Sequence, residues 1–205
     1  LKGILNNNIK VNKNIFLKTK IIKPEILNKI DNILGDINLT TKFELDIDKS
    51  FNIKNSNFIF DGETKEIKLE TKIFDNFSQF IKKKGNLIIF KDLKLKAEAN
   101  KKRNKINVDG KYIINEKFQK FQFLNKFDKK NLHHFFSGSF NIDDVEILLP
   151  ILNYKKSKKD NSQLTFSGIL NSKNILSFDE ILFKEGKSEI KIKKINFNNK
   201  FKIIS

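Results

Sequence analysis

The sequence predicts a mainly β protein, an elongated and curved antiparallel sheet that forms a repeating, taco-like β-groove with one or two short helices. Three observations lead to this prediction. Apolar and polar residues alternate over several long segments, short polar breaks separate these segments, and glycine recurs in a similar apolar setting. Because successive side chains of a strand point to opposite faces, the alternation predicts a sheet with one apolar and one polar face.

The clearest strand lies in residues 36–47, DINLTTKFELDI. Its odd positions are mostly apolar and its even positions are all polar. At about 3.3 Å per residue this strand would span roughly 40 Å, well beyond the usual length. The same alternation recurs in residues 67–73, 93–99, 106–114, 164–170 and 190–197, with one shift of phase in the last segment.

Short polar segments, such as residues 100–104, lie between the alternating segments. They are typical of hairpin turns, and short connections make neighbouring strands antiparallel. We therefore expect a single β-rich region over residues 1–205, with a sheet of about nine to twelve strands.

Three segments show helical features instead. The first covers residues 24–34, where a proline opens the segment and a glycine follows it. Its apolar stripe at helical spacing consists of Ile26, Leu27, Ile30, Ile33 and Leu34. Shorter helices are expected over residues 74–83 and around residues 145–152, the latter weakened by a proline. Residues 154–162, YKKSKKDNS, predict a charged loop.

A weak internal repeat of the form apolar-x-Gly-x-apolar organises the second half of the chain. It occurs as VDGKY, FSGSF and FSGIL around Gly110, Gly138 and Gly168, with spacings of 28 and 30 residues. A glycine on the apolar face of a strand removes a side chain and marks a bend, a bulge or a close backbone approach. Two interpretations are open: coincidence, or a β-hairpin that repeats and stacks edge to edge.

The composition is strongly basic, with 41 Lys and Arg against 24 Asp and Glu and a formal net charge of +17. Such a charge suggests nucleic acid or an anionic membrane as a partner. Proteins that read nucleic-acid sequences depend on arginine, however, and Arg103 is the single arginine. Lysine is spread over every segment, so we expect a solvated basic outer face and no nucleic-acid partner.

The residues that carry chemistry do not form a recognisable constellation. His133 and His134 are adjacent, so they point in different directions and cannot readily share one metal ion, even with Asp143 and Asp144 nearby. The chain has no cysteine, no G-x-S-x-G elbow and no glycine-rich phosphate loop. We therefore expect no catalytic residue, no metal, no cofactor and no enzymatic activity.

The apolar face is the remaining candidate site, because a large apolar surface must be covered or used. A second sheet could seal it, as in a sandwich, or the sheet could curl around acyl chains; periodicity alone leaves both open. In the second case, lipid-binding side chains would come from the apolar positions of successive strands. These are Leu39, Phe43, Leu45, Leu69, Leu93, Leu95, Val108, Tyr112, Phe140 and Phe166.

Over residues 4–200 the chain resembles AsmA-like envelope proteins, the relatives of AsmA, TamB and YhdP. The resemblance is carried by the rhythm of the strands, by IIKPEILNKIDNIL, and by FKDLKLKAEANKKRNKINVDGKYIINEKFQKFQF. It implies a repeating β-groove in the periplasm of a Gram-negative cell that carries phospholipids between the inner and outer membranes. It also implies a larger protein, anchored in the inner membrane by regions outside this chain. The alternative function is a structural or adhesive β-sandwich module without lipid transport.

Overall fold

A ten-stranded antiparallel sheet dominates the fold. The structure is a computed structural model, and it describes residues 1–15, 28–72, 75, 81–82, 85–149, 153–158, 161–173, 175–198 and 204. The strands, in spatial order, are β1 (Lys2–Asn12), β2 (Ile30–Ile47), β3 (Ile53–Thr71), β5 (Leu87–Asn100), β6 (Arg103–Ile113), β7 (Gln119–Asp128), β8 (His133–Asn141), β11 (Ser162–Leu170), β12 (Leu176–Glu185) and β13 (Ser188–Phe197). A second, small sheet contains β10 (Tyr154–Lys156), β9 (Glu146–Leu149) and β4 (Ile81–Lys82) in that order. The predicted fold class is confirmed.

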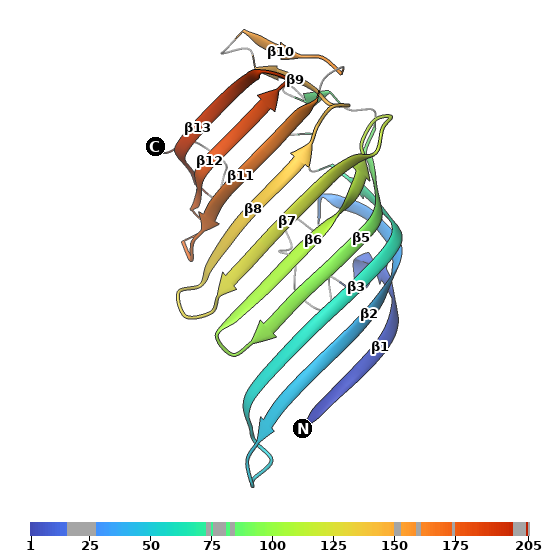
Figure 1. Cartoon of the computed structure of the whole chain (residues 1–205), viewed down its shortest axis with the longest axis vertical. Helices are drawn as coiled ribbons and strands as arrows, with labels where there is room; N and C mark the ends of the chain where they lie inside the picture. Colours follow the sequence, from blue (N-terminus) through green and yellow to red (C-terminus); the bar gives the residue numbers. More distant parts are fainter. Residues whose placement is uncertain are drawn as a thin grey trace.

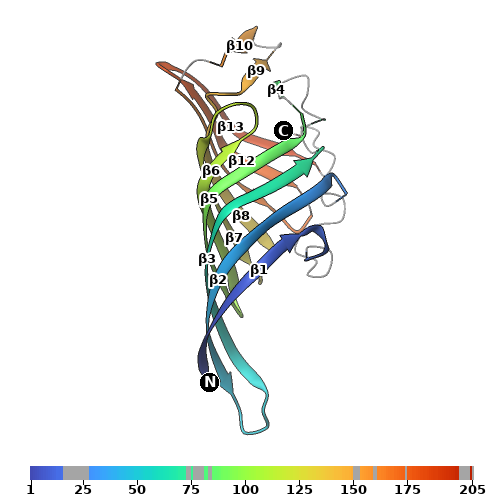
Figure 2. The ribbon, with the colours of Figure 1, turned by 90° about the vertical axis from the view of Figure 1, so that its right-hand side faces the viewer.

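The sheet is curved and has two different ends. Figure 1 shows the strands side by side, and Figure 2 shows that the sheet bends into a trough. One end carries the turns that follow β2, β5, β7 and β11, at residues 48–52, 101–102, 129–132 and 171–175, and is called the hairpin end. The other end carries the small sheet and the turn after β6, and is called the packed end.

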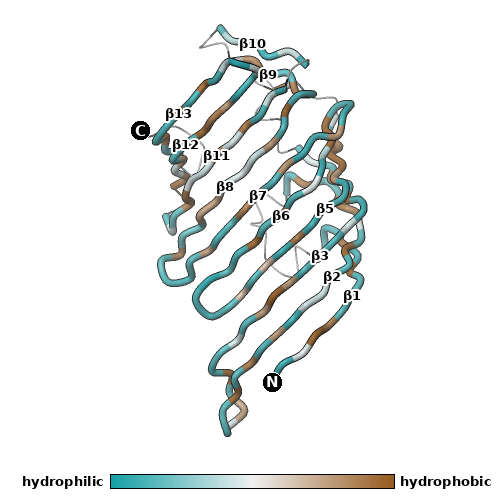
Figure 3. Tube along the Cα trace, viewed as in Figure 1, coloured by the Kyte–Doolittle hydropathy of each residue, from teal (hydrophilic) through white to brown (hydrophobic). Residues whose placement is uncertain are grey.

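The alternation predicted from the sequence holds along most strands of the sheet. Hydrophobic and hydrophilic residues alternate along most strands in Figure 3. In antiparallel strands, directly paired residues share a face. Leu39 pairs with Gly62, and Gly62 with Leu95, so these three residues lie on the same face. We call the face that contains Leu39 and Leu95 the inner face, and the opposite face the outer face.

The first predicted helix is wrong where the structure describes it. Residues 30–34 belong to β2, in which Ile33 pairs with Leu69 of β3. The remainder, up to residue 27, lies outside the described residues. An apolar pattern at positions 30, 33 and 34 fits a helix, but it also fits a strand whose pairing slips, and register shifts occur here at Ile30/Asn32 and at Gly35/Asn38. Isoleucine favours strands, and pairing with β1 and β3 decides the outcome.

The two shorter helices are also wrong in most of their described parts, although residue 75 has 3₁₀ geometry. Residues 81–82 form β4, and residues 146–149 form β9, which pairs with both β4 and β10. Most of segment 74–83 and residues 150–152 lie outside the described residues. Helical backbone is present instead at residues 13–15, just after β1. In the described part of the chain, no helix is long and apolar enough to cross a membrane.

The best-packed region of the sheet lies at the packed end of β1, β2 and β3. Its core cluster contains Val11, Ile30, Ile33 and Ile67, all less than 10% exposed. Two of these residues come from the segment that the sequence suggested was helical. Pairing β2 with β3 over most of their length brings these side chains together, so the core depends on contacts between distant parts of the chain.

We predict that Ile67→Ala lowers the free energy of unfolding by about 2–4 kcal/mol, because it removes a buried side chain and leaves a cavity. The matched control is Ile59→Ala on the same strand, where Ile59 is 39% exposed and the loss should stay below about 1 kcal/mol. Urea denaturation followed by circular dichroism measures both. Equal losses for the two variants would contradict the proposed position of the core.

Candidate functional site

The inner face carries a continuous lane of side chains that crosses nine strands. Each member pairs directly with the next, from β2 to β13. We call this set the transverse lane; its members are Leu39, Gly62, Leu95, Val108, Phe123, Gly138, Phe166, Ile181 and Ile192. With neighbouring strands about 4.8 Å apart, the lane is roughly 40 Å long. It contains no polar side chain.

Aromatic contacts indicate that the inner face is the concave one. The rings of Tyr112 on β6 and Phe140 on β8 lie 5.8 Å apart, although β7 separates their strands. Phe136 on β8 and Phe178 on β12 are similarly 5.4 Å apart across β11. Alternate strands of a flat sheet are about 9.6 Å apart. The side chains therefore converge, as expected inside a trough.

Glycines on the inner face make room for this convergence. Gly138 lies opposite both Phe123 and Phe166, and a Cβ at this position would lie 2.6 Å from Cζ of Phe166. Gly168 lies opposite Phe136, whose Cζ would be 2.8 Å from an added Cβ. Gly138 and Gly168 of the recurring motif thus have a packing role, because a ring from one strand covers the backbone of the next; at Gly110 the side chain of Leu93 lies there instead.

Burial along the inner face changes from one end to the other. The buried apolar side chains of the described residues all lie towards the packed end, for example Ile33, Ile88 and Val145. Nearer the hairpin end, Leu5 is 54% exposed and Ile106 is 37% exposed. Side chains of the transverse lane, such as Leu95 and Phe166, are intermediate. Within the described residues no second sheet lies over the middle of the trough, because the small sheet sits at one end.

All ten residues predicted from the sequence lie on the inner face. Four of them belong to the transverse lane: Leu39, Leu95, Val108 and Phe166. Phe43, Leu45 and Phe140 lie beside the lane and are only half-buried. The other three lie at the packed end. Leu69 and Leu93 pack against the core cluster, and Tyr112 is 4% exposed.

Tyr112 is held by a side-chain hydrogen bond and by burial at the packed end. Its hydroxyl donates to the carbonyl oxygen of Asn141 at 2.6 Å. Burial raises the pKa of this hydroxyl well above its ordinary value, with smaller contributions from the charges of Asp143 and Asp144. The residue is therefore a neutral part of the core, and its hydroxyl already has an acceptor.

The residues near Tyr112 form a network of buried polar groups. The Asp144 carboxylate accepts the backbone N–H groups of Glu116 and Lys117, and so holds the turn after β6. Lys156 is fully buried, and its ammonium donates to three carbonyl oxygens, those of Asp143, Val145 and Ser157. The charged loop predicted at residues 154–162 is thus wrong for residues 154–156, which form β10. Buried polar groups of this kind need partners, and here the backbone supplies them.

The two histidines lie on opposite faces. The ring of His134 stacks on Phe127 of the inner face at 4.4 Å, whereas His133 pairs with Asp128. The carboxylates of Asp143 and Asp144 accept backbone N–H groups from Ser162 and from the turn after β6. Among the described residues, no three His, Cys, Asp or Glu side chains are grouped closely enough to hold a metal ion.

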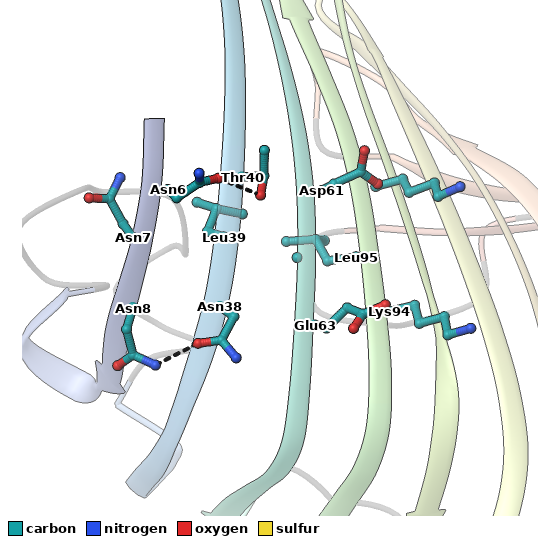
Figure 4. Close-up of a pocket in the computed structure, with 12 residues that line it drawn as sticks. Asn6, Asn7, Asn8, Asn38, Leu39, Thr40, Asp61, Glu63, Lys94 and Leu95 are labelled. Carbon is teal, nitrogen blue, oxygen red and sulfur yellow. Dashed lines mark hydrogen bonds between the residues drawn. The ribbon is translucent and has the colours of Figure 1, made fainter. Parts of the chain in front are cut away.

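The outer face is polar and solvated. A shallow hollow of about 700 Å³ lies over β1, β2, β3 and β5, and Figure 4 shows its polar side chains. Amides and hydroxyls bridge the strands: Thr40 donates to Asn6 at 2.8 Å, and Asn8 donates to Asn38 at 2.7 Å. Neighbouring Lys94, Lys96, Asp61 and Glu63 balance one another in charge. This arrangement fits a wet surface with no strong preference for one ligand.

A second hollow, of about 340 Å³, lies at the hairpin end and was not predicted from the sequence. It is lined by Lys54, Lys101 and Lys129 together with Phe58 and Ala99. These lysines come from three separate strand ends or turns. Only the pairing of β3, β5, β6, β7 and β8 brings them together, and in a chain with so many lysines no sequence signal distinguishes them.

Comparisons of this chain with protein-family models, with curated proteins and with solved structures found no match. The relation to AsmA-like proteins therefore remains a proposal.

The glycine packing gives a test. We predict that Gly138→Ala lowers the free energy of unfolding by about 1–3 kcal/mol, because the new methyl group overlaps the Phe166 ring. Adding Phe166→Leu should recover part of this loss, since the smaller side chain leaves space. Urea denaturation of both single variants and of the double variant gives the coupling energy.

Gly168→Ala is the matched comparison. An added methyl group there meets backbone atoms, the Ser177 carbonyl oxygen and Cα of Phe178, as well as the Phe136 ring. Phe136→Leu should therefore fail to recover the loss. Strictly additive effects for Gly138→Ala and Phe166→Leu would contradict the contact between them.

Proposed function

We propose that this chain holds or conducts the acyl chains of phospholipid in its apolar β-groove. The observation that carries the proposal is the transverse lane, a polar-free track that crosses nine strands on the concave face. Its side chains remain partly exposed in the described structure. Apolar surface left accessible inside a concavity is suited to an apolar ligand.

The energetics of such binding need no directed contacts. Each methylene that leaves water contributes about 0.8 kcal/mol, so a lipid tail on Leu, Ile, Val and Phe side chains is stabilised by burial alone. Because successive positions along the lane are chemically alike, a tail that moves by one strand exchanges one set of apolar contacts for another. A track of this kind supports movement of lipid without catalysis.

The proposal also places the chain in a larger protein. The curved antiparallel groove is the architecture that the resemblance to AsmA-like proteins implies. We propose a periplasmic segment between the inner and outer membranes of a Gram-negative cell, with the membrane anchor in regions outside this chain. The absence of cysteine is compatible with such a compartment.

The competing function is a structural or adhesive β-module whose apolar face is sealed. The observation that favours it is the packed end, where Val11, Ile33 and Ile67 form an ordinary protein core. The two functions differ in the middle of the sheet. There, the groove leaves Leu95 accessible to lipid, whereas a sealed module buries it.

We predict that Leu95→Asp abolishes lipid crosslinking and leaves the protein folded, because a groove wall exposed to water tolerates a charge. The control is Lys96→Asp, which places the same residue one position along on the outer face. Crosslinking uses a photoactivatable phosphatidylethanolamine on protein purified without detergent, beside thermal melting. Crosslinking should persist in the control.

The outcomes separate the two functions. In a sealed module, Leu95→Asp would bury an unpaired charge and cost several kcal/mol, so the melting transition would collapse. Such a collapse, or equal crosslinking of the original protein and Leu95→Asp, rejects the groove.

A further inference from the structure

The hollow at the hairpin end lies where the inner face ends. Phe58 and Ala99 form its apolar side. Phe58 pairs directly with Ala99 on one side and with Phe43 on the other. Ser56 lies on the inner face, because it pairs with Leu45. Lys54 lies at a shift in the pairing of β2 with β3, and Lys101 lies in the turn after β5. Both line the hollow together with Ser56 and the exposed Ile53. Ammonium groups and a hydroxyl therefore lie beside apolar side chains at this edge of the inner face.

The charge of this hollow is positive and is not neutralised by its own lining. Lys54, Lys101 and Lys129 line it, and none of its lining residues is acidic. The Lys129 ammonium donates to the Asn100 carbonyl oxygen at 2.6 Å, which holds it across the β5–β6 turn. Lys54 and Lys101 form no ion pair with any described carboxylate.

The acidic residues of the neighbouring turns are engaged in the turns themselves. The Asp48 carboxylate accepts the N–H groups of Ser50 and Asn52. The Asp128 carboxylate accepts the N–H of Lys130 and the amide of Asn131, and these hydrogen bonds lower its pKa. Both carboxylates therefore fix the geometry of their own turns.

The inner face also becomes more polar in the central strands as it approaches the hairpin end. Asn104 of β6, Asn125 of β7 and His134 of β8 lie there on the inner face, and the Asn125 amide oxygen is 3.3 Å from Nδ1 of His134. The buried Oδ1 of Asn104 has no hydrogen-bond partner among the described residues. The transverse lane lies one or two inner-face positions closer to the packed end and contains no polar side chain.

From this polarity we infer that the hollow lined by Lys54, Lys101 and Lys129 binds the phosphate of an anionic phospholipid whose acyl chains lie on the neighbouring apolar face. The inference rests on the proposed function and adds a site and an orientation to it. The head group lies at the hairpin end, and the tails extend into the trough. Three ammonium groups around an apolar floor match a phosphate joined to hydrocarbon, because each part meets its complement.

The test compares two lipids with the same tails. Dioleoylphosphatidylglycerol carries a phosphate, and dioleoylglycerol does not. Purified protein is loaded with an equimolar mixture, and the bound lipid is quantified by mass spectrometry. We expect the original protein to prefer the phosphate-bearing lipid. In the triple variant K54Q/K101Q/K129Q, the ratio of bound phosphatidylglycerol to bound dioleoylglycerol should fall at least fivefold, while the amount of bound dioleoylglycerol is unchanged.

Two further variants control for total charge and for chemistry. K42Q/K105Q/K126Q removes three lysines from the outer face and should keep the preference, which separates the hollow from the general basic charge. K54R/K101R/K129R retains three cations in the hollow and should keep it as well. Thermal melting of each variant checks that the fold is intact.

Each outcome has a distinct meaning. An unchanged preference in K54Q/K101Q/K129Q, or an equal loss in the outer-face variant, overturns the head-group site and leaves the groove standing. Retention of neither lipid by the original protein overturns the proposed function itself. Loss of bound phosphatidylglycerol on addition of millimolar inorganic phosphate, with dioleoylglycerol unaffected, would show that the hollow binds free phosphate and would overturn its assignment to a lipid.

Discussion

The convergence of side chains on the concave face is the constraint on which the rest of this structure depends. A curved sheet brings the inner side chains of alternate strands together, so rings from β6 and β8, or from β8 and β12, come into contact. Large side chains at every inner position would overfill the trough. Glycine at positions such as 138 and 168 removes a side chain where a neighbouring ring needs the space. The curved sheet therefore keeps an apolar lining by placing glycine opposite large aromatic side chains.

The same sheet combines two physical regimes. At the packed end, a core cluster and a network of buried hydrogen bonds around Asp144 and Lys156 close the structure. Towards the hairpin end, apolar side chains remain exposed and polar groups become more frequent. The packed end supplies stability that the open part cannot supply, because partly exposed side chains contribute less burial. This division allows an accessible apolar face to persist in a folded protein.

The proposed lipid groove and the proposed head-group site depend on different directions of the inner face. Apolar side chains form a uniform track across the strands, while polarity changes along the strands. In the proposed arrangement, a tail would move across the sheet, whereas its head group would be kept at one side. The outer face, with its balanced charges and strand-bridging amides, keeps the sheet in water without competing for the same ligand.

The sequence by itself determined the strands and their faces, because a period of two specifies which side chains share a face wherever the chain is extended. Of the ten residues expected to share one stripe, Leu39, Leu95, Val108 and Phe166 lie in one lane of paired positions. Tertiary structure decided the rest. Residues 30–34 have apolar spacing that suits either a helix or a bulged strand, and pairing with β3 made them part of β2. The sequence places Lys156 in a charged, solvated loop. In the structure it is buried, and its ammonium donates to three carbonyl oxygens of distant and adjacent residues. Tyr112 and Leu95 have the same local pattern, but the Asn141 carbonyl oxygen and the rings of Phe121 and Phe140 enclose Tyr112, whereas Leu95 stays partly exposed.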